Sequence, residues 1–420
     1  MPTPSPTLTL DAARDLVAAR SLRPSARLLV GVELEWLVYP ATEPRHDPVS
    51  LARLQDAVDA AGPLPGGGAI TYEPGGQLEL SSAAGTLGET LRRTCTDAAL
   101  LRDALGRAGL APVGLGLDPV RPRRRVVDTP RYEAMEAYFD TGGPAGRTMM
   151  CGTAALQISL DTGAPDDVET RWARAHHLGP LLLAAFANSP LLEGRPSGWR
   201  SSRWGAWDRI DPGRTAPVYC ADRPGTAGDQ WAQYALDAGV MLILGDGHEA
   251  EPVLEALTFG QWIEHGHAGV WPTVDDLTYH LTTLFPPVRP QGRFELRMID
   301  ALPDPWWRVA VAVTTALLDD PHAAVTAELA TVPLRDRWCD AAEHGLSDPV
   351  FAEAAQTCFD AALKALPRLH ADRATNDLAR DYTARFVDVG RTPADDRLDE
   401  WTATGRVMPP EPVSTTTWRR

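Results

Sequence analysis

Hydrophobic and polar residues alternate with a period of two in several separate stretches of the chain. In RLLVGVELEWLVY, Glu33 and Glu35 share one parity and apolar side chains occupy the other. This period predicts a β-strand with one buried and one polar face. The same alternation predicts two short strands around a Pro-Gly-Gly turn in AITYEPGGQLELSS (69–82), one strand in RTMMCGTAALQISLD (147–161) and one in GRFELRMI (292–299).

Segments with helical periodicity lie between these strands and after them. Helices are predicted over 9–20, 50–61, 86–109, 166–187, 229–238 and 272–285, and beyond Trp306 the chain reads as mostly helical to about residue 390. VMLIL (240–244) is a further apolar strand, whereas 193–225 is a long segment without clear periodicity, of the kind that is often functional. Antiparallel-type strands with long helices between them favour an α+β fold over repeated βαβ units.

Composition and charge exclude several classes of protein. The 420 residues include 40 Lys and Arg against 56 Asp and Glu, so the net charge is −16, which argues against nucleic acid or an anionic membrane surface as a partner. Apolar residues make up 44%, too many for general disorder, and five widely spaced cysteines do not make a disulfide scaffold. No signal peptide or membrane span is recognisable. We expect a cytoplasmic protein with one domain over 1–405 and a loose tail over 406–420.

The lysine content restricts how the protein can bind a nucleotide. Lys364 is the single lysine, and it lies in a helical stretch, DAALKALP. A P-loop needs GxxxxGK[ST], in which lysine reaches the phosphates, so this class of nucleotide site is excluded. If the protein uses ATP, arginine or metal ions must supply the positive charge.

The predicted strands place an unusual number of acidic and amide groups on one face. Strands are normally depleted in Asp and Glu. Such a face can simply be solvated, but a solvated face usually mixes acids with Lys, Thr and Arg, and this one is almost purely acidic. If the strands share a sheet, the carboxylates need a positive partner, and Mg²⁺ is a hard cation that prefers carboxylate oxygens. The residues concerned are Glu33, Glu35, Glu73, Gln77, Glu79, Gln157 and Glu295, with Arg297 beside the last.

Four motifs in this order resemble one enzyme family. They are GVELEW (31–36), YEPGGQLELS (72–81), MMCGTAALQISLD (149–161) and PTVDDLTYHLTTLFPPVRPQGRFELRMIDALP (272–303). The chain is similar to the plant-type glutamate–cysteine ligases, and within them to the actinobacterial branch that supplies γ-glutamylcysteine for ergothioneine biosynthesis. The resemblance extends from about residue 28 to about residue 400 and includes GRTPADD (390–396).

The resemblance implies a fold, a reaction and a set of ligands. The fold would be glutamine-synthetase-like, with a curved antiparallel sheet forming a funnel-shaped active site and helices packed outside. The reaction would join L-glutamate and L-cysteine at the expense of ATP through a γ-glutamyl phosphate, with two or three Mg²⁺ ions as cofactors.

The resemblance also implies roles for particular residues. Metal ligands would be Glu33, Glu35, Glu73, Glu79, Glu295 and Gln157, with Glu295 and Arg297 also catalytic. Arg297 would contact a phosphoryl oxygen of the nucleotide, but an ion pair with Glu295 is an equal alternative on the sequence alone. Arg203 and Arg214, in a more loosely matching segment, and Thr153 would contact substrate; the alternative for the arginines is a surface loop. His280 would line the nucleotide site or be a buried, hydrogen-bonded histidine.

Two other functions stay open at this point. A related carboxylate–amine ligase would use the same metal and ATP chemistry with another amine acceptor. A non-catalytic metal- or nucleotide-binding protein could keep the scaffold, although every expected ligand position still has Glu or Gln.

Overall fold

A seven-stranded antiparallel sheet is the central element of the structure, a computed structural model that describes residues 8–42, 47–245 and 249–408. The strands follow the order β10-β11-β5-β1-β3-β2, and β4 pairs with the second half of β1. Every pairing between neighbouring strands of this sheet is antiparallel, so the α+β arrangement expected from the alternation is confirmed. The strands are β1 (Val30–Pro40), β2 (Ala69–Tyr72), β3 (Leu78–Ser81), β4 (Leu110–Val113), β5 (Ala155–Leu160), β10 (Val288–Pro290) and β11 (Phe294–Asp300).

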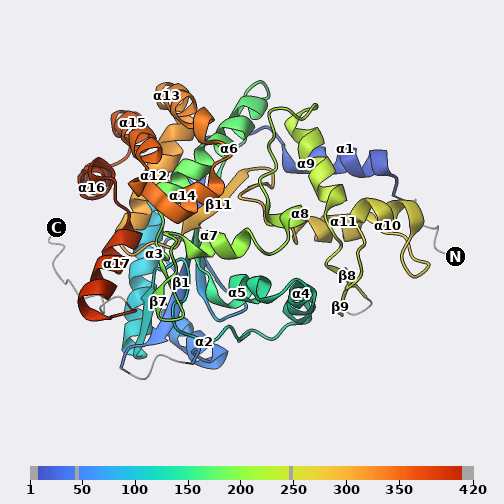
Figure 1. The fold of residues 1–420 in the computed structure, drawn as a ribbon, viewed down its shortest axis with the longest axis horizontal. Coiled ribbons are helices and arrows are strands. Elements are labelled where there is room, and N and C mark those ends of the chain that lie inside the picture. The colour runs from blue at the N-terminus through green and yellow to red at the C-terminus, as the bar shows by residue number, and fades with distance from the viewer. Residues whose placement is uncertain (1–7, 43–46, 246–248, 409–420) are drawn as a thin grey trace.

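Helices surround the sheet in groups that follow the chain (Figure 1). The first half of the described chain supplies α1 (Leu10–Ser21), α2 (Leu51–Asp59), α3 (Leu87–Arg107), α4 (Pro130–Asp140), α5 (Pro144–Gly152), α6 (Val168–Ala185) and α7 (Ser202–Trp207). The second half supplies α8 (Pro212–Thr215), α9 (Ala227–Asp237), α10 (Phe259–His265), α11 (Val274–Leu281), α12 (Trp306–Asp319), α13 (Pro321–Thr331), α14 (Trp338–His344), α15 (Pro349–Ala365), α16 (Arg373–Arg385) and α17 (Pro393–Thr404).

Two small hairpins and three short 3₁₀ turns complete the described elements. The hairpins are β6 (Leu191–Leu192) with β7 (Arg195–Pro196), and β8 (Leu242–Leu244) with β9 (Ala250–Pro252). The turns are η2 (Val332–Leu334), η3 (Gly345–Ser347) and η4 (Val387–Val389).

Local sequence explains where several helices begin. A capping box starts each of the helices α3, α9, α10, α11 and α17. In this motif the hydroxyl of the N-cap threonine accepts a hydrogen bond from the backbone amide of the third helical residue, and the acid or amide side chain of that residue accepts one from the N-cap backbone amide. These side chains satisfy backbone N–H groups that have no partner within the helix. The predicted helices are confirmed, with bounds that differ by a few residues.

The predicted strand over 147–161 is wrong in its first half. Residues Pro144–Gly152 form α5, and the strand begins only at Ala155. Proline at the first helical position favours helix initiation, and the strict alternation starts only at Thr153, where the backbone becomes extended. The aperiodic segment 193–225 contains two short helices, α7 and α8.

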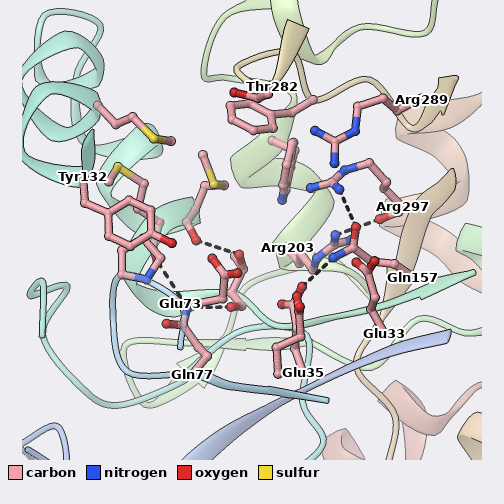
Figure 2. A pocket seen from close by; sticks show the side chains of 18 of the residues that line it. Glu33, Glu35, Glu73, Gln77, Tyr132, Gln157, Arg203, Thr282, Arg289 and Arg297 are labelled. Carbon is pink, nitrogen blue, oxygen red and sulfur yellow. Dashed lines mark hydrogen bonds between the residues drawn. The ribbon is translucent and has the colours of Figure 1, made fainter. Parts of the chain in front are cut away.

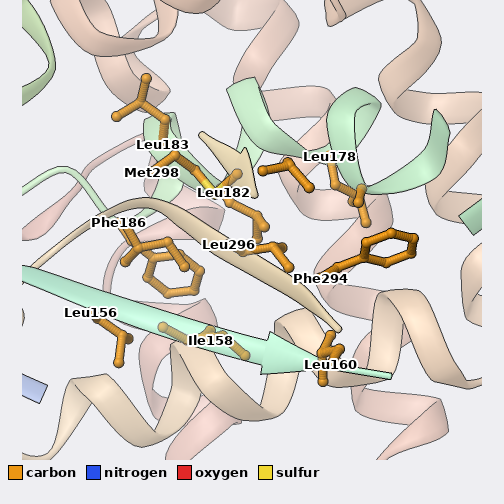
Figure 3. Close-up of a cluster of buried hydrophobic side chains, with 14 of the residues drawn as sticks. Leu156, Ile158, Leu160, Leu178, Leu182, Leu183, Phe186, Phe294, Leu296 and Met298 are labelled. Carbon is orange, nitrogen blue, oxygen red and sulfur yellow. The ribbon is translucent and has the colours of Figure 1, made fainter. Parts of the chain in front are cut away.

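The apolar face of the sheet is covered by α6 (Figure 3). Proline inside this helix is tolerated, and 14 of its 18 residues are buried, as expected for a helix in a protein interior. No side chain of the contact layer is more than 1% exposed. The layer consists of Leu156, Ile158 and Leu160 on β5, Phe294, Leu296 and Met298 on β11, Leu178, Leu182 and Leu183 on α6, and Phe186 at the C-cap of α6.

Because this layer fills one face of the sheet, Gln157 and Glu295 are directed to the other face. The largest hydrophobic cluster includes residues from Leu8 to Val387. None of the described helices is long and apolar enough to cross a membrane. A single domain over 1–405 stays a prediction, and residues 409–420 of the predicted tail lie outside the described part of the chain.

We expect Leu182→Ala to lower the free energy of unfolding by about 2–5 kcal/mol, because it leaves a cavity between α6 and the sheet. Leu329→Ala is the matched control: Leu329 is 76% exposed on α13, and its truncation should change stability by no more than about 0.5 kcal/mol. Urea unfolding of both variants measures the difference. Equal effects would contradict this account of the core.

Candidate active site

A cavity opens between the polar face of the sheet and the helices α4, α5 and α7 (Figure 2). Its acidic side consists of glutamates from the sheet, and its other sides contain arginines and apolar side chains. The acids and amides are Glu33, Glu35, Glu73, Gln77, Glu79 and Gln157; the arginines are Arg131, Arg203, Arg289 and Arg297; the remaining lining residues are Pro74, Tyr132, Met135, Met149, Met150, Thr153, Trp207, Thr282 and Phe285.

Strand register brings the acidic groups together from distant parts of the sequence. Glu35 lies opposite Glu79 on β3, and Glu33 lies opposite Gln157 on β5. Glu73 follows β2 in the turn that leads to β3, where its amide donates to the carbonyl of Gln77 over 2.9 Å. The predicted convergence of these side chains in one site therefore exists in the structure.

The turn also requires glycine. Gly76 has a φ of +82°, a left-handed conformation that glycine adopts without strain. A Cβ on Gly75 would lie 2.3 Å from the carbonyl oxygen of Cys151 at the end of α5. The Pro-Gly-Gly sequence thus lets the turn pack against α5 and hold Glu73 at the cavity.

The crowded carboxylates shift one another's ionisation. Burial, together with Glu295 and Glu79, raises the pKa of Glu33 to about 7. Burial and the neighbouring Glu73 and Glu79 raise the pKa of Glu35 to about 8. The pKa of Glu73 rises to about 7 for the same reasons, burial and Glu79. This side of the cavity has more negative charge than the protein itself compensates.

Glu295 differs from the other glutamates because two arginines neutralise it. Its carboxylate lies 2.6 Å from Nε of Arg289 and 3.1 Å from Nη1 of Arg297. Burial alone would raise the pKa of Glu295, but these guanidinium groups lower it to about 2. The ion-pair alternative for Arg297 is therefore realised, although Arg297 also lines the cavity and its Nε has no protein partner.

Gln157 connects the acidic and basic groups. Its amide nitrogen donates to Glu35 over 2.9 Å, and its amide oxygen accepts from Nη1 of Arg297. The second oxygen of Glu35 accepts from the amide of Ala155 over 2.8 Å. The oxygen expected to bind a metal is thus occupied by Arg297 in this conformation.

Helix α7 contributes Arg203 and Trp207 to the cavity. The Arg203 side chain is buried and donates to the carbonyl oxygens of Arg297 and Met298, over 2.8 Å and 3.4 Å. Among the described residues, neither its Nε nor the indole nitrogen of Trp207 has a hydrogen-bond partner. Buried donors without partners are costly, so they are expected to bind a ligand group.

Thr153 lies at the cavity, as the resemblance implied, through both its side chain and its backbone. Its hydroxyl donates to the backbone carbonyl of Met149. Its own backbone carbonyl accepts from the side-chain amide of Gln77 over 2.8 Å. Thr153 therefore joins the end of α5 to the β2–β3 turn.

Arg214 and His280 do not line this cavity, which corrects both predictions. Arg214 is fully buried and donates to Asp211, Tyr138 and the carbonyls of Thr283 and Gly239, so its guanidinium has a structural role. His280 bonds through Nε2 to the carbonyl of Ala235, and burial lowers its pKa to about 3. It is the buried histidine of the alternative interpretation. Motif membership did not reveal which way either side chain points.

Sequence reasoning missed Arg131, Tyr132 and Arg289 at the cavity. Arg289 lies opposite Glu295 in the β10–β11 pairing, so a basic residue beside the acidic strand was an available signal. Arg131 and Tyr132 come from the start of α4, and nothing in TPRYEAM pointed to the sheet. Burial and Glu73 raise the pKa of Tyr132.

The donor set fits a divalent cation, but the conformation is not that of a finished metal site. Among residues 8–42, 47–245 and 249–408, no three acidic, histidine or cysteine groups are arranged closely enough to coordinate one ion. Four of the carboxylates, Glu33, Glu35, Glu73 and Glu79, are oxygen ligands of the kind that Mg²⁺ prefers.

Comparisons with solved structures agree with the predicted fold class. The glutamate–cysteine ligase of Francisella tularensis, solved with AMP, matches with a TM-score of 0.51 and 12% identity over 91% of this chain and 86% of that one. A bifunctional glutathione synthetase from Pasteurella multocida matches with a TM-score of 0.50 and 15% identity over 93% of this chain and 51% of that one. At these identities the likeness shows the fold alone, and this chain shares the fold of these two enzymes.

Sequence relatives are much closer. A "Glutamate--cysteine ligase EgtA" of Mycolicibacterium smegmatis is 42% identical over 93% of this chain and 91% of its own length. The protein of the same name from Mycobacterium tuberculosis is 40% identical over 90% and 87%. A chloroplastic glutamate–cysteine ligase of Brassica juncea is 32% identical over 57% of this chain and 47% of its own. The sequence model of glutamate-cysteine ligase family 2 matches residues 29–412. The resemblance inferred from the four motifs is confirmed, and the chain belongs to glutamate-cysteine ligase family 2.

Proposed function

We propose that this protein is an ATP-dependent glutamate–cysteine ligase that forms γ-glutamylcysteine in the cytoplasm, for ergothioneine biosynthesis. The observation on which this depends is the composition of one cavity. Glutamates with raised pKa values occupy one side, and Arg203 and Arg297 on other sides each have a buried Nε without a partner. A site with both features can hold a metal–nucleotide complex and an anionic substrate together.

The chemistry requires both charges. A carboxylate is a poor electrophile, so the γ-carboxylate of glutamate first attacks the γ-phosphorus of ATP and releases ADP. The amine of cysteine then attacks the acyl phosphate, an amide bond forms, a proton leaves the nitrogen, and phosphate departs. Negative charge on the phosphoryl oxygens must be stabilised while the group moves. Arginine is suited to this because its planar guanidinium donates two parallel hydrogen bonds.

The geometry suggests a division of roles among the residues. Arg297, which lines the cavity beside Arg289, is proposed to contact the transferred phosphoryl group. Arg203 is proposed to bind a carboxylate of an amino-acid substrate, with Thr153 shaping the same part of the cavity. Glu33, Glu35, Glu73 and Glu79 would hold Mg²⁺, which would neutralise charge on the nucleotide phosphates. Glu295 and Gln157 are hydrogen-bonded to arginines. We therefore propose that they orient Arg297, in preference to a role as metal ligands.

One observation favours cysteine over other amines. Met135, Met149 and Met150 line the cavity beside Trp207 and Phe285. Thioether and aromatic groups are polarizable and suit a thiol-sized apolar side chain. A related ligase with a different amine acceptor would be expected to present polar groups here.

Arg297→Lys should lower kcat by about 10²-fold or more, because a lysine cannot reproduce the guanidinium contacts to Gln157, Glu295 and a phosphoryl oxygen. Phosphate release with ATP, glutamate and cysteine measures the rate. Arg102→Lys, in a partly exposed pair with Asp304, is the control and should retain wild-type activity. A fully active Arg297→Lys enzyme would remove Arg297 from the mechanism.

Cysteine should be the preferred acceptor among amines of similar size. With ATP and glutamate, we expect kcat/KM for cysteine to exceed that for serine by at least about tenfold, because the hydroxyl would be desolvated against methionines. 2-Aminobutyrate, which is apolar and similar in size, should fall between them. Serine turned over as efficiently as cysteine would favour the alternative ligase.

Stability of the metal-free protein should fall as pH rises from about 5 to 8. The pKa values of Glu33, Glu35 and Glu73 are about 7, 8 and 7 in the folded protein against an ordinary value of 4.5, so the folded state holds more protons than the unfolded state within this window. Raising the pH removes those protons and weakens the fold. Mg²⁺ should therefore raise the melting temperature more at pH 8.5 than at pH 6.

Glu35→Gln isolates this effect, because the amide has no proton to lose and stays neutral as the pH rises. With a chelator present, the variant should melt a few degrees higher than the wild type at pH 8.5 and show less dependence on pH. Glu353→Gln, an exposed position on α15, should behave like the wild type. Identical pH profiles for Glu35→Gln and the wild type would show that Glu35 is not an uncompensated charge.

A further inference from the structure

A fully buried carboxylate lies at the end of β11, outside the cavity. Asp300 is 0% exposed and follows Arg297 by three residues on the same strand. One oxygen accepts from the hydroxyl of Ser201 over 2.9 Å. The other accepts from the hydroxyl of Ser189 over 2.7 Å and from the amide of Asn188 over 2.8 Å. The carboxylate therefore accepts three hydrogen bonds, and Asp300 is not among the residues that line the active-site cavity.

The two serines connect Asp300 to the first turn of α7. Ser201 is the N-cap of this helix, and its hydroxyl oxygen accepts from the amide of Trp204 over 3.3 Å. The hydroxyl oxygen of Ser189 accepts from the amide of Arg203 over 3.2 Å. A hydroxyl has one proton to donate, so a serine that donates to the carboxylate has its lone pairs left for these amides. Asp300 thus sets the direction of both hydroxyls.

The side chain of Arg203 is held to the same strand. Its Nη1 lies 3.9 Å from Asp300, and its guanidinium donates to the carbonyls of Met298 and Arg297. Residues of β11 therefore position both the backbone and the guanidinium group of Arg203. The same strand also places Glu295 and Arg297. The Nε atom is left free of protein partners beside the cavity.

Gly116 packs closely against the Asp300 side chain. A Cβ on Gly116 would lie 2.3 Å from Cγ of Asp300. Gly116 also donates its amide to the carbonyl of Asn188 over 3.2 Å. The loop after β4 therefore closes over the carboxylate and keeps it away from water, where each hydrogen bond to the charged group is strong.

We propose that Asp300 is a positioning residue for substrate binding: through Ser189 and Ser201 it fixes the start of α7, so that Arg203 faces the carboxylate of an amino-acid substrate. This inference rests on the proposed function, which assigns that carboxylate to Arg203. Asp300 itself does not contact substrate. Loss of its charge should act on the substrate that Arg203 binds and leave nucleotide binding unchanged.

The test compares kinetics of Asp300→Asn with those of Arg203→Lys. Both variants should raise KM for the same amino acid, by about ten- to hundredfold, with KM for ATP within about twofold of wild type. Combining them should give little more than the larger single effect, because both act on one contact. Asp319→Asn is the matched control: Asp319 is a buried carboxylate paired with Arg171 over 2.7 Å, remote from α7, and its loss should leave both KM values unchanged.

A second variant covers the case in which Asp300→Asn does not fold. Ser189→Ala leaves the carboxylate in place, removes one of the two connections to α7, and should raise the same KM by a smaller factor. Raised KM for ATP alone, or multiplicative effects of Asp300→Asn and Arg203→Lys, would overturn the proposal. The proposal would also be overturned if the KM for the amino acid were unchanged in both single variants, Ser189→Ala and Asp300→Asn.

Hydrogen exchange separates this inference from the proposed function. Without any substrate, amides in a peptide covering 201–207 should exchange faster in Asp300→Asn or Ser189→Ala than in wild type or Asp319→Asn. If the wild type forms no γ-glutamylcysteine, the proposed function fails, yet faster exchange in α7 would still support the positioning role. Unchanged exchange in both variants, with an active wild type, would reject the positioning role alone.

Discussion

Repulsion among carboxylates on one face of a sheet is the constraint on which the rest of the site depends. Antiparallel pairing places Glu33, Glu35 and Glu79 on neighbouring strands, and the turn after β2 adds Glu73. Burial prevents water from screening these charges, and the pKa values of Glu33, Glu35 and Glu73 rise. In the same sheet, the opposite face of β5 and β11 is a tightly packed apolar layer against α6. The fold thus holds several glutamates close together, and a bound cation can neutralise their negative charge.

The arginines of the cavity divide into two kinds according to what they contact. Arg289 pairs mainly with Glu295 and, together with Arg297, lowers the pKa of that carboxyl group. Arg203 and Arg297 also contact protein groups, but each retains a buried Nε without a partner. A site with satisfied arginines would be a structural ion-pair network. The unsatisfied donors are what make this cavity suitable for anionic ligands, in keeping with membership of a ligase family.

Particular residues show how far sequence reasoning reached. The period-two pattern placed Glu33 and Glu35 on one face of β1 and predicted that separate strands would bring acids together, which the register of β1, β3 and β5 shows. The motifs identified the family. The same motifs did not reveal that Arg214 and His280 point into the protein, because a motif preserves spacing along the chain and says nothing about side-chain direction. They also missed Arg131 and Tyr132, which reach the cavity from the start of α4.

Local chemistry, then, was enough to determine which residues face away from the core, where the helices are capped, and which family the chain belongs to. These properties depend on periodicity and on neighbours a few positions apart. Only the tertiary structure decided which arginines form ion pairs with carboxylates. It also decided that Gln157 is hydrogen-bonded to both Glu35 and Arg297, and that Asp300 is connected to α7 through two serines. The reason is physical: the contacts of Gln157 and of Asp300 join groups roughly a hundred residues apart. The pairs that Arg289 and Arg297 make with Glu295 are close in sequence, but strand register and packing in three dimensions decide which carboxylate each arginine meets.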